Sequence, residues 1–549
     1  MDSIWEARGA RCSTKRGAED FPGLGNGGLQ VLCGALSLPM NHPARAAVRG
    51  PSGGAARRLG RFRLCVTRRN WKTRSFSSRS PLRDAPAISF PVRSCARKSH
   101  EVCEPLLLAP VKILFLTPGT GSYHCGVCMR DNALAKELRA LGHDAVLLPL
   151  YLPLTLDESA ASPGAPVFFG GLNVYLQQRF PWFRKAPSWL DPLLDHPWLL
   201  GWLGRFSGMT QGAEIGALTL SMLRGEEGAQ VREVEKLAEW VQTVERPDIV
   251  WLSTGLLAGV ARRIQAGLRI PVLCSLQGED SFLDGLPEPW RSECWREMGM
   301  RIGECAGCVA PSAYFADAME RRLNVNSGFI EVIPNGIGLE GMAPPDGPRP
   351  GKGPTIGFLS RLSAGKGLGT VVDAFLELRA RGRHPEARLI CTGTMNQGDE
   401  PFLGVQRRKL AAAGLGESSE FRIRVTREEK IQFLRELDVL SVPASYGEAF
   451  GLYLLEAMAC GVPVVQPRTA AFPEIIDSTG GGLLYDENGG ASALADAWEQ
   501  LFSSPENMRL LGKTGRDGVL RAHSMGHMAS KFLAYAERVC FSENQPSGS

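Results

Sequence analysis

The stretch SYGEAFGLYLLEAMACGVPVV, residues 445–465, carries a strong structural signal, and the rest of the chain can be interpreted around it. An apolar run from Val439 to Pro443 precedes it, and a second run, Val462 to Gln466, ends it. Both runs predict buried strands. Between them, Leu452 to Ala459 consists mostly of Leu, Glu, Ala and Met, which favour a helix. The stretch therefore predicts a strand, a loop, a helix and a strand, which is the unit of a parallel α/β sheet.

The loop before this helix has the features of an anion site. It is rich in glycine, which lets the backbone approach a ligand closely. The amides of Phe450, Gly451 and Leu452 lie where a helix N-terminus attracts phosphate. Glu448 stands just before the helix, and Glu456 lies about one turn inside it. Carboxylates accept bidentate hydrogen bonds from paired hydroxyls, so the loop predicts a nucleotide-sugar site. The alternative is an amphipathic helix with two solvated glutamates.

This stretch resembles the signature of family 4 glycosyltransferases, in which two glutamates frame a Phe-Gly-Leu turn. The tail EAMACGVPVV is also similar to that family. The resemblance implies that Glu448 is catalytic and faces the donor sugar, while Glu456 holds the ribose of the nucleotide. It further implies an α/β protein with the GT-B fold, two facing Rossmann-like domains with parallel sheets and a cleft between them. Transfer would retain the configuration of the sugar.

A second loop follows the strand predicted from Thr355 to Ser360. Its sequence, Arg361-Leu-Ser-Ala-Gly-Lys366, lacks the residues that a P-loop needs on either side, which disfavours ATP hydrolysis. Arg361 and Lys366 match the basic pair that family 4 enzymes place on the donor diphosphate. Two fixed cations can neutralise a leaving pyrophosphate, and no Asp-x-Asp lies in a cleft-facing loop. We therefore expect no metal and no other cofactor. The alternative is that both cations are ordinary surface residues.

The N-terminal part of the chain repeats strand–helix units and carries the expected acceptor site. Strands are predicted at 111–117, 145–150, 248–254, 271–276, 309–312 and 329–333, as in a parallel sheet. By the resemblance, the loops after the first and fourth of these strands face the cleft. The candidate residues are Gly126, Arg130, Asp131, Asn132, Gln277, Glu279 and Asp280. Many family members have histidine where this chain has Gln277, which favours simple hydrogen bonding here. Helix capping is the alternative role.

Two cysteine pairs, Cys125 with Cys128 and Cys305 with Cys308, have metal-ligand spacing. The first pair follows the carboxyl end of a strand, whereas the second precedes a strand. In a parallel sheet these positions lie at opposite edges, so buried or capping thiols are favoured over a shared zinc site. A redox role for the first pair stays open.

The segment from Phe180 to Trp202 holds four tryptophans and four prolines, which disfavours a long regular helix. Tryptophan is amphipathic and favours interfaces, so the segment could form a lid or a lipid-facing acceptor site. The favoured interpretation is an irregular helical insertion with its tryptophans packed inward, because charged residues interrupt any apolar face.

Composition divides the 549 residues into parts. Residues 1–105 carry 19 Lys or Arg against 7 Asp or Glu, which leaves 43 basic and 50 acidic residues in the rest. The first part is therefore expected to be a disordered basic leader, with an organelle transit peptide as the alternative. The predicted parts are a leader at 1–109, an acceptor domain at 110–340, a linker at 341–354, a nucleotide-sugar domain at 355–523 and a final helix at 524–541. We expect that helix to pack across both domains, with its histidines at the surface.

Together these features predict an enzyme that transfers a sugar from a nucleotide-sugar donor to a hydroxyl of a glycan, lipid or small-molecule acceptor. The mildly acidic body argues against nucleic acid as a partner. The 14 scattered cysteines favour a reducing cytoplasm, with peripheral contact at the inner face of the membrane left open. Two alternatives remain: a nucleotide-sugar epimerase or hydrolase of the same fold, and a non-catalytic sugar-nucleotide-binding protein.

Overall fold

The computed structural model describes residues 110–119, 126–151, 156, 159–162, 212–345, 347, 353–395 and 397–542. All of them fall within one compact unit of the chain. The predictions for the leader, residues 1–109, and for the tryptophan-rich segment, residues 180–202, lie outside the described residues.

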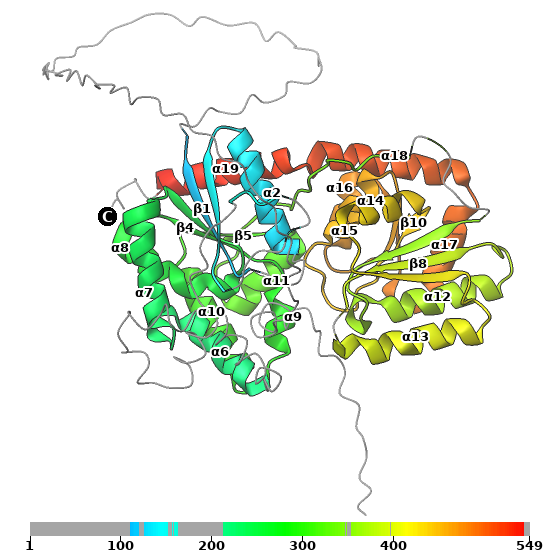
Figure 1. Ribbon diagram of the computed structural model, residues 1–549, viewed down its shortest axis with the longest axis horizontal. Coiled ribbons are helices and arrows are strands. Elements are labelled where there is room, and N and C mark those ends of the chain that lie inside the picture. The colour runs from blue at the N-terminus through cyan, green and yellow to red at the C-terminus, as the bar shows by residue number, and fades with distance from the viewer. Residues whose placement is uncertain are drawn as a thin grey trace, which may run out of the picture. The chain divides into compact units, whose positions relative to one another are not determined.

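The first domain is built on a six-stranded sheet in which all neighbouring strands are parallel (Figure 1). Its strands are β1 (Lys112–Thr117), β2 (Asp144–Pro149), β3 (Ile249–Leu252), β4 (Val272–Ser275), β5 (Gly307–Ala310) and β6 (Ile330–Val332). They lie in the order β2-β1-β3-β4-β5-β6. The chain thus builds outward in both directions from β1. In such sheets, ligands bind at the carboxyl ends of the strands, where the order reverses.

Strand β1 shows why the sheet is apolar on both faces. Ile113 and Phe115 join the core formed with α2 (Gly126–Ala140) and α19 (Met525–Ser542), whereas Leu114 joins the core of the other face. The helices of that other face are α6 (Gly212–Arg224), α7 (Val231–Trp240), α8 (Ala261–Leu268), α9 (Glu279–Asp284), α10 (Trp290–Gly303) and α11 (Ala313–Leu323). A strand that is covered by helices on both faces has an almost continuous apolar sequence.

The second domain repeats this architecture on another six-stranded parallel sheet, in the order β12-β11-β10-β7-β8-β9. Its strands are β7 (Thr355–Leu359), β8 (Arg388–Gly393), β9 (Ser419–Ile423), β10 (Val439–Leu440), β11 (Val464–Pro467) and β12 (Gly482–Tyr485). Its helices are α12 (Leu368–Ala380), α13 (Glu400–Ala412), α14 (Arg427–Glu436), α15 (Leu452–Ala459), α16 (Phe472–Thr479), α17 (Gly490–Phe502) and α18 (Pro505–Ala522). The prediction of two α/β domains with parallel sheets is confirmed.

The sequence predicted most elements closely and some boundaries less well. Helix α15 spans Leu452–Ala459, as predicted. Helix α2 begins at Gly126, one turn before the predicted start near Arg130, so the candidate acceptor residues lie on the helix itself. Strand β5 starts at Gly307 rather than Val309, because its pairing with β4 begins there.

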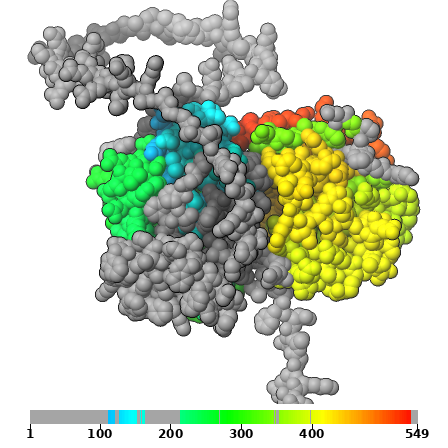
Figure 2. Space-filling view, in the orientation of Figure 1, coloured from blue at the N-terminus to red at the C-terminus, as the bar shows by residue number. Residues whose placement is uncertain are grey.

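The chain passes between the domains twice, at neighbouring positions. Ile337, where it leaves the first domain, forms a bridge with Ser524, where it returns. Helix α18 packs on the second domain against α15 and α16, and its surface runs along one edge of that domain (Figure 2). Helices α18 and α19 have 18 residues each, but no helix of the described chain is apolar enough over such a length to cross a membrane.

Helix α19 packs against the first domain, whereas the sequence predicted that it packs across both. The ring of Phe532 lies 5.0 Å from Trp251 and 6.2 Å from Phe115, measured between ring centroids. The Tyr535 hydroxyl donates to the carbonyl of Cys308 at 3.3 Å. The last helix therefore returns to cover the sheet on which the described chain begins.

Candidate functional site

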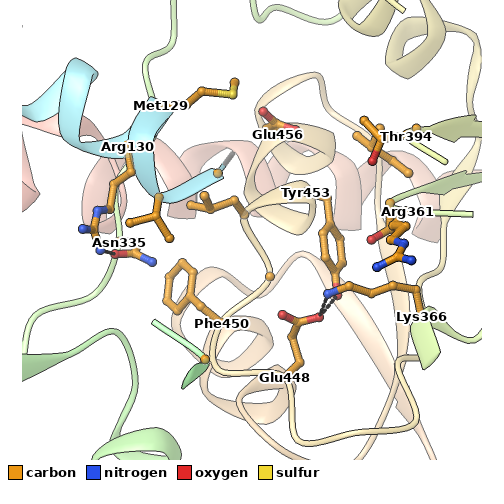
Figure 3. A pocket seen from close by; sticks show the side chains of 18 of the residues that line it. Met129, Arg130, Asn335, Arg361, Lys366, Thr394, Glu448, Phe450, Tyr453 and Glu456 are labelled. Carbon is orange, nitrogen blue, oxygen red and sulfur yellow. Dashed lines mark hydrogen bonds and ion pairs between the residues drawn. The ribbon is translucent and has the colours of Figure 1, made fainter. Parts of the chain in front are cut away.

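A cavity of about 570 Å³ lies at the carboxyl ends of the strands, and residues of both domains line it (Figure 3). Most of the residues predicted for the site meet there. Those that line the cavity are Gly126, Arg130, Gln277, Asp280, Arg361, Lys366, Glu448, Phe450, Gly451, Leu452 and Glu456. The predicted residues Asp131, Asn132 and Glu279 do not line it.

The N-terminus of α15 forms one wall of the cavity. Gly451 is its N-cap and has a φ of 107°, a conformation that favours glycine. No side chain caps this end, so the first amides of the helix lack a side-chain acceptor. Phe450 beside it is buried, with its ring centroid 6.0 Å from that of His523. The loop thus presents backbone donors and a helix dipole to the cavity, as an anion site requires.

Glu448 and Lys366 form an ion pair inside the cavity. The Lys366 Nζ lies 2.6 Å from Glu448 Oε2, and the Tyr453 hydroxyl donates to the same oxygen at 3.1 Å. Both charged side chains keep some exposure, 19% for the lysine and 13% for the glutamate. Burial lowers the pKa of Lys366, but the charges and hydrogen bonds of Glu448 and Tyr446 together outweigh burial, and the net shift of this pKa is upward. The ammonium group therefore stays protonated, and it can reach a ligand.

A conformational constraint places this lysine. The short 3-10 turn η7 (Ala364–Lys366) ends at Gly367, whose φ is 78°. A Cβ on Gly367 would lie 1.9 Å from the carbonyl oxygen of Pro443, so only glycine lets the two loops pass this closely. The ammonium of Lys366 also lies 4.8 Å from the ring centroid of Tyr446, a cation–π contact. Burial raises the pKa of Tyr446 to about 12, and the charge of Glu448 adds to the shift.

Arg361 lines the same wall but is held by an acidic partner. Its Nε donates to Asp399 Oδ2 at 2.8 Å and its Nη2 donates to Oδ1 at 3.0 Å, a bidentate arrangement. Both side chains are buried. The sequence predicted a fixed cation at this position, and Asp399 holds the guanidinium in place and balances its charge.

Glu456 points into the cavity from α15 (Figure 3) and pairs with a residue that the sequence analysis missed. The Lys430 Nζ of α14 donates to Glu456 Oε1 at 2.9 Å. The two side chains are 13% and 15% exposed. Lys430 belongs to no motif, and only the packing of α14 beside α15 brings it to the site. The pair leaves a carboxylate at the cavity wall with a defined orientation.

On the first-domain side, Arg130 and Asp131 are buried together. The Arg130 Nη2 lies 2.6 Å from Asp131 Oδ1, and neither side chain is exposed. Arg130 Nη1 also donates to Ser275 Oγ at 3.1 Å and to Asn335 Oδ1 at 3.4 Å. Burial raises the pKa of Asp131, against the opposing charge of Arg130. The pair ties α2 to the ends of β4 and β6 and does not offer Asp131 to a ligand.

Two more predicted acceptor residues have structural roles. Asn132 accepts a hydrogen bond from the amide of Ala161 at 2.7 Å and donates to the carbonyl of Ser159 at 3.1 Å. Glu279 is 4% exposed. Its carboxylate accepts hydrogen bonds from the Thr254 hydroxyl at 2.6 Å and from the backbone N–H of Gln277 at 2.7 Å. Each polar side chain satisfies buried backbone or hydroxyl donors, which explains its position without a ligand.

Gln277 and Asp280 do face the cavity. The Gln277 amide group donates to Ser275 Oγ at 2.8 Å and accepts from Asn335 Nδ2 at 3.1 Å. Burial raises the pKa of Asp280 to about 6, and the charge of Glu279 adds to the shift. Near neutral pH, Asp280 is therefore a carboxylate that binds a proton more readily than usual. It can accept a hydrogen bond from a hydroxyl group.

The structure overturns one expectation about the histidines. His527 is exposed, but His523 is buried. Its Nε2 lies 2.9 Å from Ser478 Oγ, and burial lowers its pKa to about 4. The sequence gave no sign of this, because the partners Ser478 and Phe450 come from distant parts of the chain. His523 supports the loop that carries Phe450 from behind.

The structure describes three of the four cysteines in the two predicted pairs. Cys128 is buried, and its sulfur lies 3.0 Å from Thr117 Oγ1. Cys305 and Cys308 are also buried and free, and Cys308 lies within β5 rather than before it. Cys125 lies outside the described residues. No cluster of three metal-ligating side chains occurs in the part of the chain that the structure describes.

Comparisons with known proteins agree with this architecture. The family model described as "Glycosyltransferase Family 4" matches residues 214–340, and the model described as "Glycosyl transferases group 1" matches residues 343–518. The chain is 30% identical over 248 residues to a D-inositol 3-phosphate glycosyltransferase of Arthrobacter sp.. It is 31% identical over 265 residues to a phosphatidyl-myo-inositol mannosyltransferase of Mycobacterium leprae.

These alignments cover 44% and 48% of this chain, and 56% and 64% of the two relatives' own lengths. Among solved structures, a sucrose-phosphate synthase from Thermosynechococcus elongatus superposes with a TM-score of 0.56 at 16% identity. That superposition covers 79% of this chain and all of the other, and it shows the shared fold. The two matched families and the paired parallel sheets place the chain in family 4 of the glycosyltransferases, with the GT-B fold.

Proposed function

We propose that this protein is a retaining glycosyltransferase, which moves a sugar from a nucleotide-sugar donor to a hydroxyl group of an acceptor. The observation that carries the proposal is the meeting of Lys366, Glu448 and Glu456 in one cavity, beside the N-terminus of α15. An anion site, a cation and two carboxylates together suit the binding of a nucleotide sugar.

The diphosphate is assigned to the amides of α15 and to Lys366. The helix amides give fixed donors, and Lys366 can exchange its partner Glu448 for a phosphate oxygen, because a lysine head is a compact charge on a flexible stem. Arg361, held by Asp399, provides a rigid polar wall behind the phosphates. Lys366 and the helix amides supply the charge stabilisation that a metal ion supplies in other transferases, so we propose a metal-independent reaction.

The donor sugar is assigned to Glu448 and the ribose to Glu456. When Lys366 turns to the phosphate, Glu448 becomes available to accept hydrogen bonds from sugar hydroxyls. In the reaction the bond between the anomeric carbon and the diphosphate oxygen breaks. A bond to the acceptor oxygen forms on the same face, and the acceptor proton passes to the departing phosphate. No enzyme nucleophile is needed in this scheme.

The acceptor is assigned to the first-domain wall, with Asp280 and Gln277 as its hydrogen-bonding groups. Their carboxylate and amide suit an acceptor with several hydroxyl groups. The names of both relatives refer to inositol-bearing compounds, which are polyols. A cytoplasmic location belongs to the same proposal, because free buried thiols suit a reducing compartment. These thiols are Cys274, Cys294, Cys305, Cys308 and Cys391.

The test is an acceptor-dependent transfer assay. Purified protein is incubated with UDP-, GDP- or ADP-sugars that carry a label in the sugar, in buffer containing EDTA. Each reaction is run without an acceptor, with polyol acceptors, and with the small molecules and lipids of a cell extract. We expect nucleoside diphosphate release that requires the acceptor, and label in a new product. Release of nucleoside diphosphate without an acceptor would indicate a hydrolase. Conversion of the free sugar nucleotide into an isomer would indicate an epimerase, and binding without turnover would indicate a binding protein.

A further inference from the structure

Arg424 has an unusual backbone conformation at the mouth of the cavity. It follows strand β9 directly and has a φ of 59°, in the left-handed region that residues other than glycine rarely adopt. Three of the other such residues, Arg246, Arg269 and Asn324, are C-caps of helical elements, where this conformation is ordinary. Arg424 caps no helix. Strain of this kind is often found at functional sites.

Arg424 is one of the residues that line the cavity, and it is exposed. The other basic residues of the cavity wall have partners. Four of them form ion pairs: Arg130 with Asp131, Arg361 with Asp399, Lys366 with Glu448, and Lys430 with Glu456. The fifth, Arg427, donates a hydrogen bond to the backbone carbonyl of Glu340. Among the basic residues that the structure describes on this wall, Arg424 has neither an ion pair nor a side-chain hydrogen bond. A cation there is available to a ligand.

The position of Arg424 identifies which part of a donor it would meet. The phosphate groups are assigned to the loops after β7 and β10, which are neighbours in the sheet. Strand β9 is the outermost strand, two positions beyond β7, or about 10 Å at the usual strand spacing. Helix α14, which follows Arg424, carries Lys430, the partner of Glu456. Arg424 thus lies beyond the phosphates, on the side of the ribose carboxylate.

We propose that Arg424 reads the base of the donor nucleotide and selects guanine. This inference rests on the proposed function, because Glu456 marks the ribose only if the cavity binds a nucleotide sugar. A guanidinium carries only donors, arranged in a planar fork. Guanine presents two adjacent acceptors, O6 and N7, to such a fork. Adenine places an amino donor beside its N7, and uracil places an N–H donor beside O4, so neither base offers the same pair.

The experiment compares Arg424→Gly with Arg269→Gly. Both substitutions remove an exposed arginine from a left-handed position, and Arg269 lies on the C-cap of α8, away from the cavity. Dissociation constants for GDP, UDP and ADP are measured by calorimetry, and unfolding temperatures are recorded for each variant. We expect the wild type to favour GDP. Arg424→Gly should weaken GDP binding by about tenfold or more, as for loss of a bidentate base contact, and change UDP and ADP binding less than about twofold.

A third variant separates base reading from charge alone. Arg424→Lys keeps the positive charge but loses the planar fork, so it should also lose the preference for GDP. Arg269→Gly should leave all three affinities unchanged. Both glycine variants should unfold at the same temperature as the wild type or higher, because glycine adopts a positive φ without strain. Weaker GDP binding in Arg424→Gly would then not be a folding defect.

Several results would overturn the inference. Equal loss of affinity for all three nucleotides in Arg424→Gly would place the guanidinium on the phosphates. Retention of the GDP preference by Arg424→Lys would mean that charge is sufficient. A wild type without a guanine preference would also reject it. If instead no nucleoside diphosphate binds the wild type at all, the proposed function itself fails, which distinguishes the two failures.

Discussion

Two ion pairs, one on each side of the cavity, differ in their burial and in their partners. Arg130–Asp131 and Lys366–Glu448 were both expected to meet substrate. The side chains of the first pair are fully buried, whereas those of the second are 19% and 13% exposed. The first arginine also bonds to Ser275 and Asn335. A charge with several buried partners organises the fold, and a charge with one partner and access to solvent can exchange it for a ligand.

The largest expected effect tests the buried pair. Arg130→Met would leave Asp131 as an uncompensated buried carboxyl and should lower the free energy of unfolding by about 3–5 kcal/mol. Urea titration measures this loss. The variant Lys366→Met should cost clearly less, because Glu448 can be solvated. Adding Asp131→Asn to Arg130→Met removes the unpaired buried carboxylate and should recover part of the lost free energy of unfolding. Equal losses for Arg130→Met and Lys366→Met would remove the distinction between the two pairs.

Glu448→Gln tests the exposed pair. We expect kcat to fall by about 100-fold, the size of effect seen when one preorganised electrostatic contact to a transition state is removed. Affinity for the nucleoside diphosphate should change little, since that part of the donor is assigned to other groups. Initial rates of sugar transfer measure the first quantity and calorimetry the second. Glu417→Gln, on an exposed side chain outside the cavity, is the control. A full rate in Glu448→Gln would reject its catalytic role.

The buried His523 should make the free energy of unfolding depend on pH. Burial lowers its folded pKa to about 4, below the value of about 6.5 in the unfolded chain. Its contribution to stability is therefore complete above pH 6.5 and is lost as the pH falls toward 4. Between pH 8 and pH 5 this amounts to about 2 kcal/mol. His523→Gln can still bond to Ser478 but does not titrate, so the stability difference between wild type and variant should shift by this amount. A difference independent of pH would contradict the assignment.

The smallest expected effect concerns Glu456. Glu456→Gln keeps the shape of the side chain but weakens its hydrogen bonds to ribose hydroxyls, and nucleotide affinity should fall by about tenfold, or about 1.4 kcal/mol. Calorimetry with the nucleoside diphosphate measures the change. Glu428→Gln, an exposed neighbour on α14 that does not line the cavity, provides the control. Equal affinity in wild type and Glu456→Gln would count against the ribose assignment.

Much of the site was predictable because its residues are close in sequence or carry a local rule. The stretch 445–465 set the α15 helix and its glycine cap by propensity alone, and the loop from Arg361 to Lys366 followed a recognisable strand. Lys430 and Arg424 were not predictable in this way. They stand in no motif, and they reach the cavity only because β9 joins the same sheet as β7 and because Lys430 of α14 pairs with Glu456 of α15.

Periodicity, glycine positions and helix propensity act over a few residues, so the sequence was sufficient to predict two parallel α/β domains and a glycine-rich loop with two carboxylates. The folded structure was needed to show which charged groups line the cavity and which support the fold. Asp131 is buried with Arg130, which also bonds to Ser275 and Asn335, and Glu279 is buried against Thr254, while Glu448 and Glu456 remain at the wall of the cavity. Burial and pairing depend on segments far apart in the chain, so no local pattern specifies them.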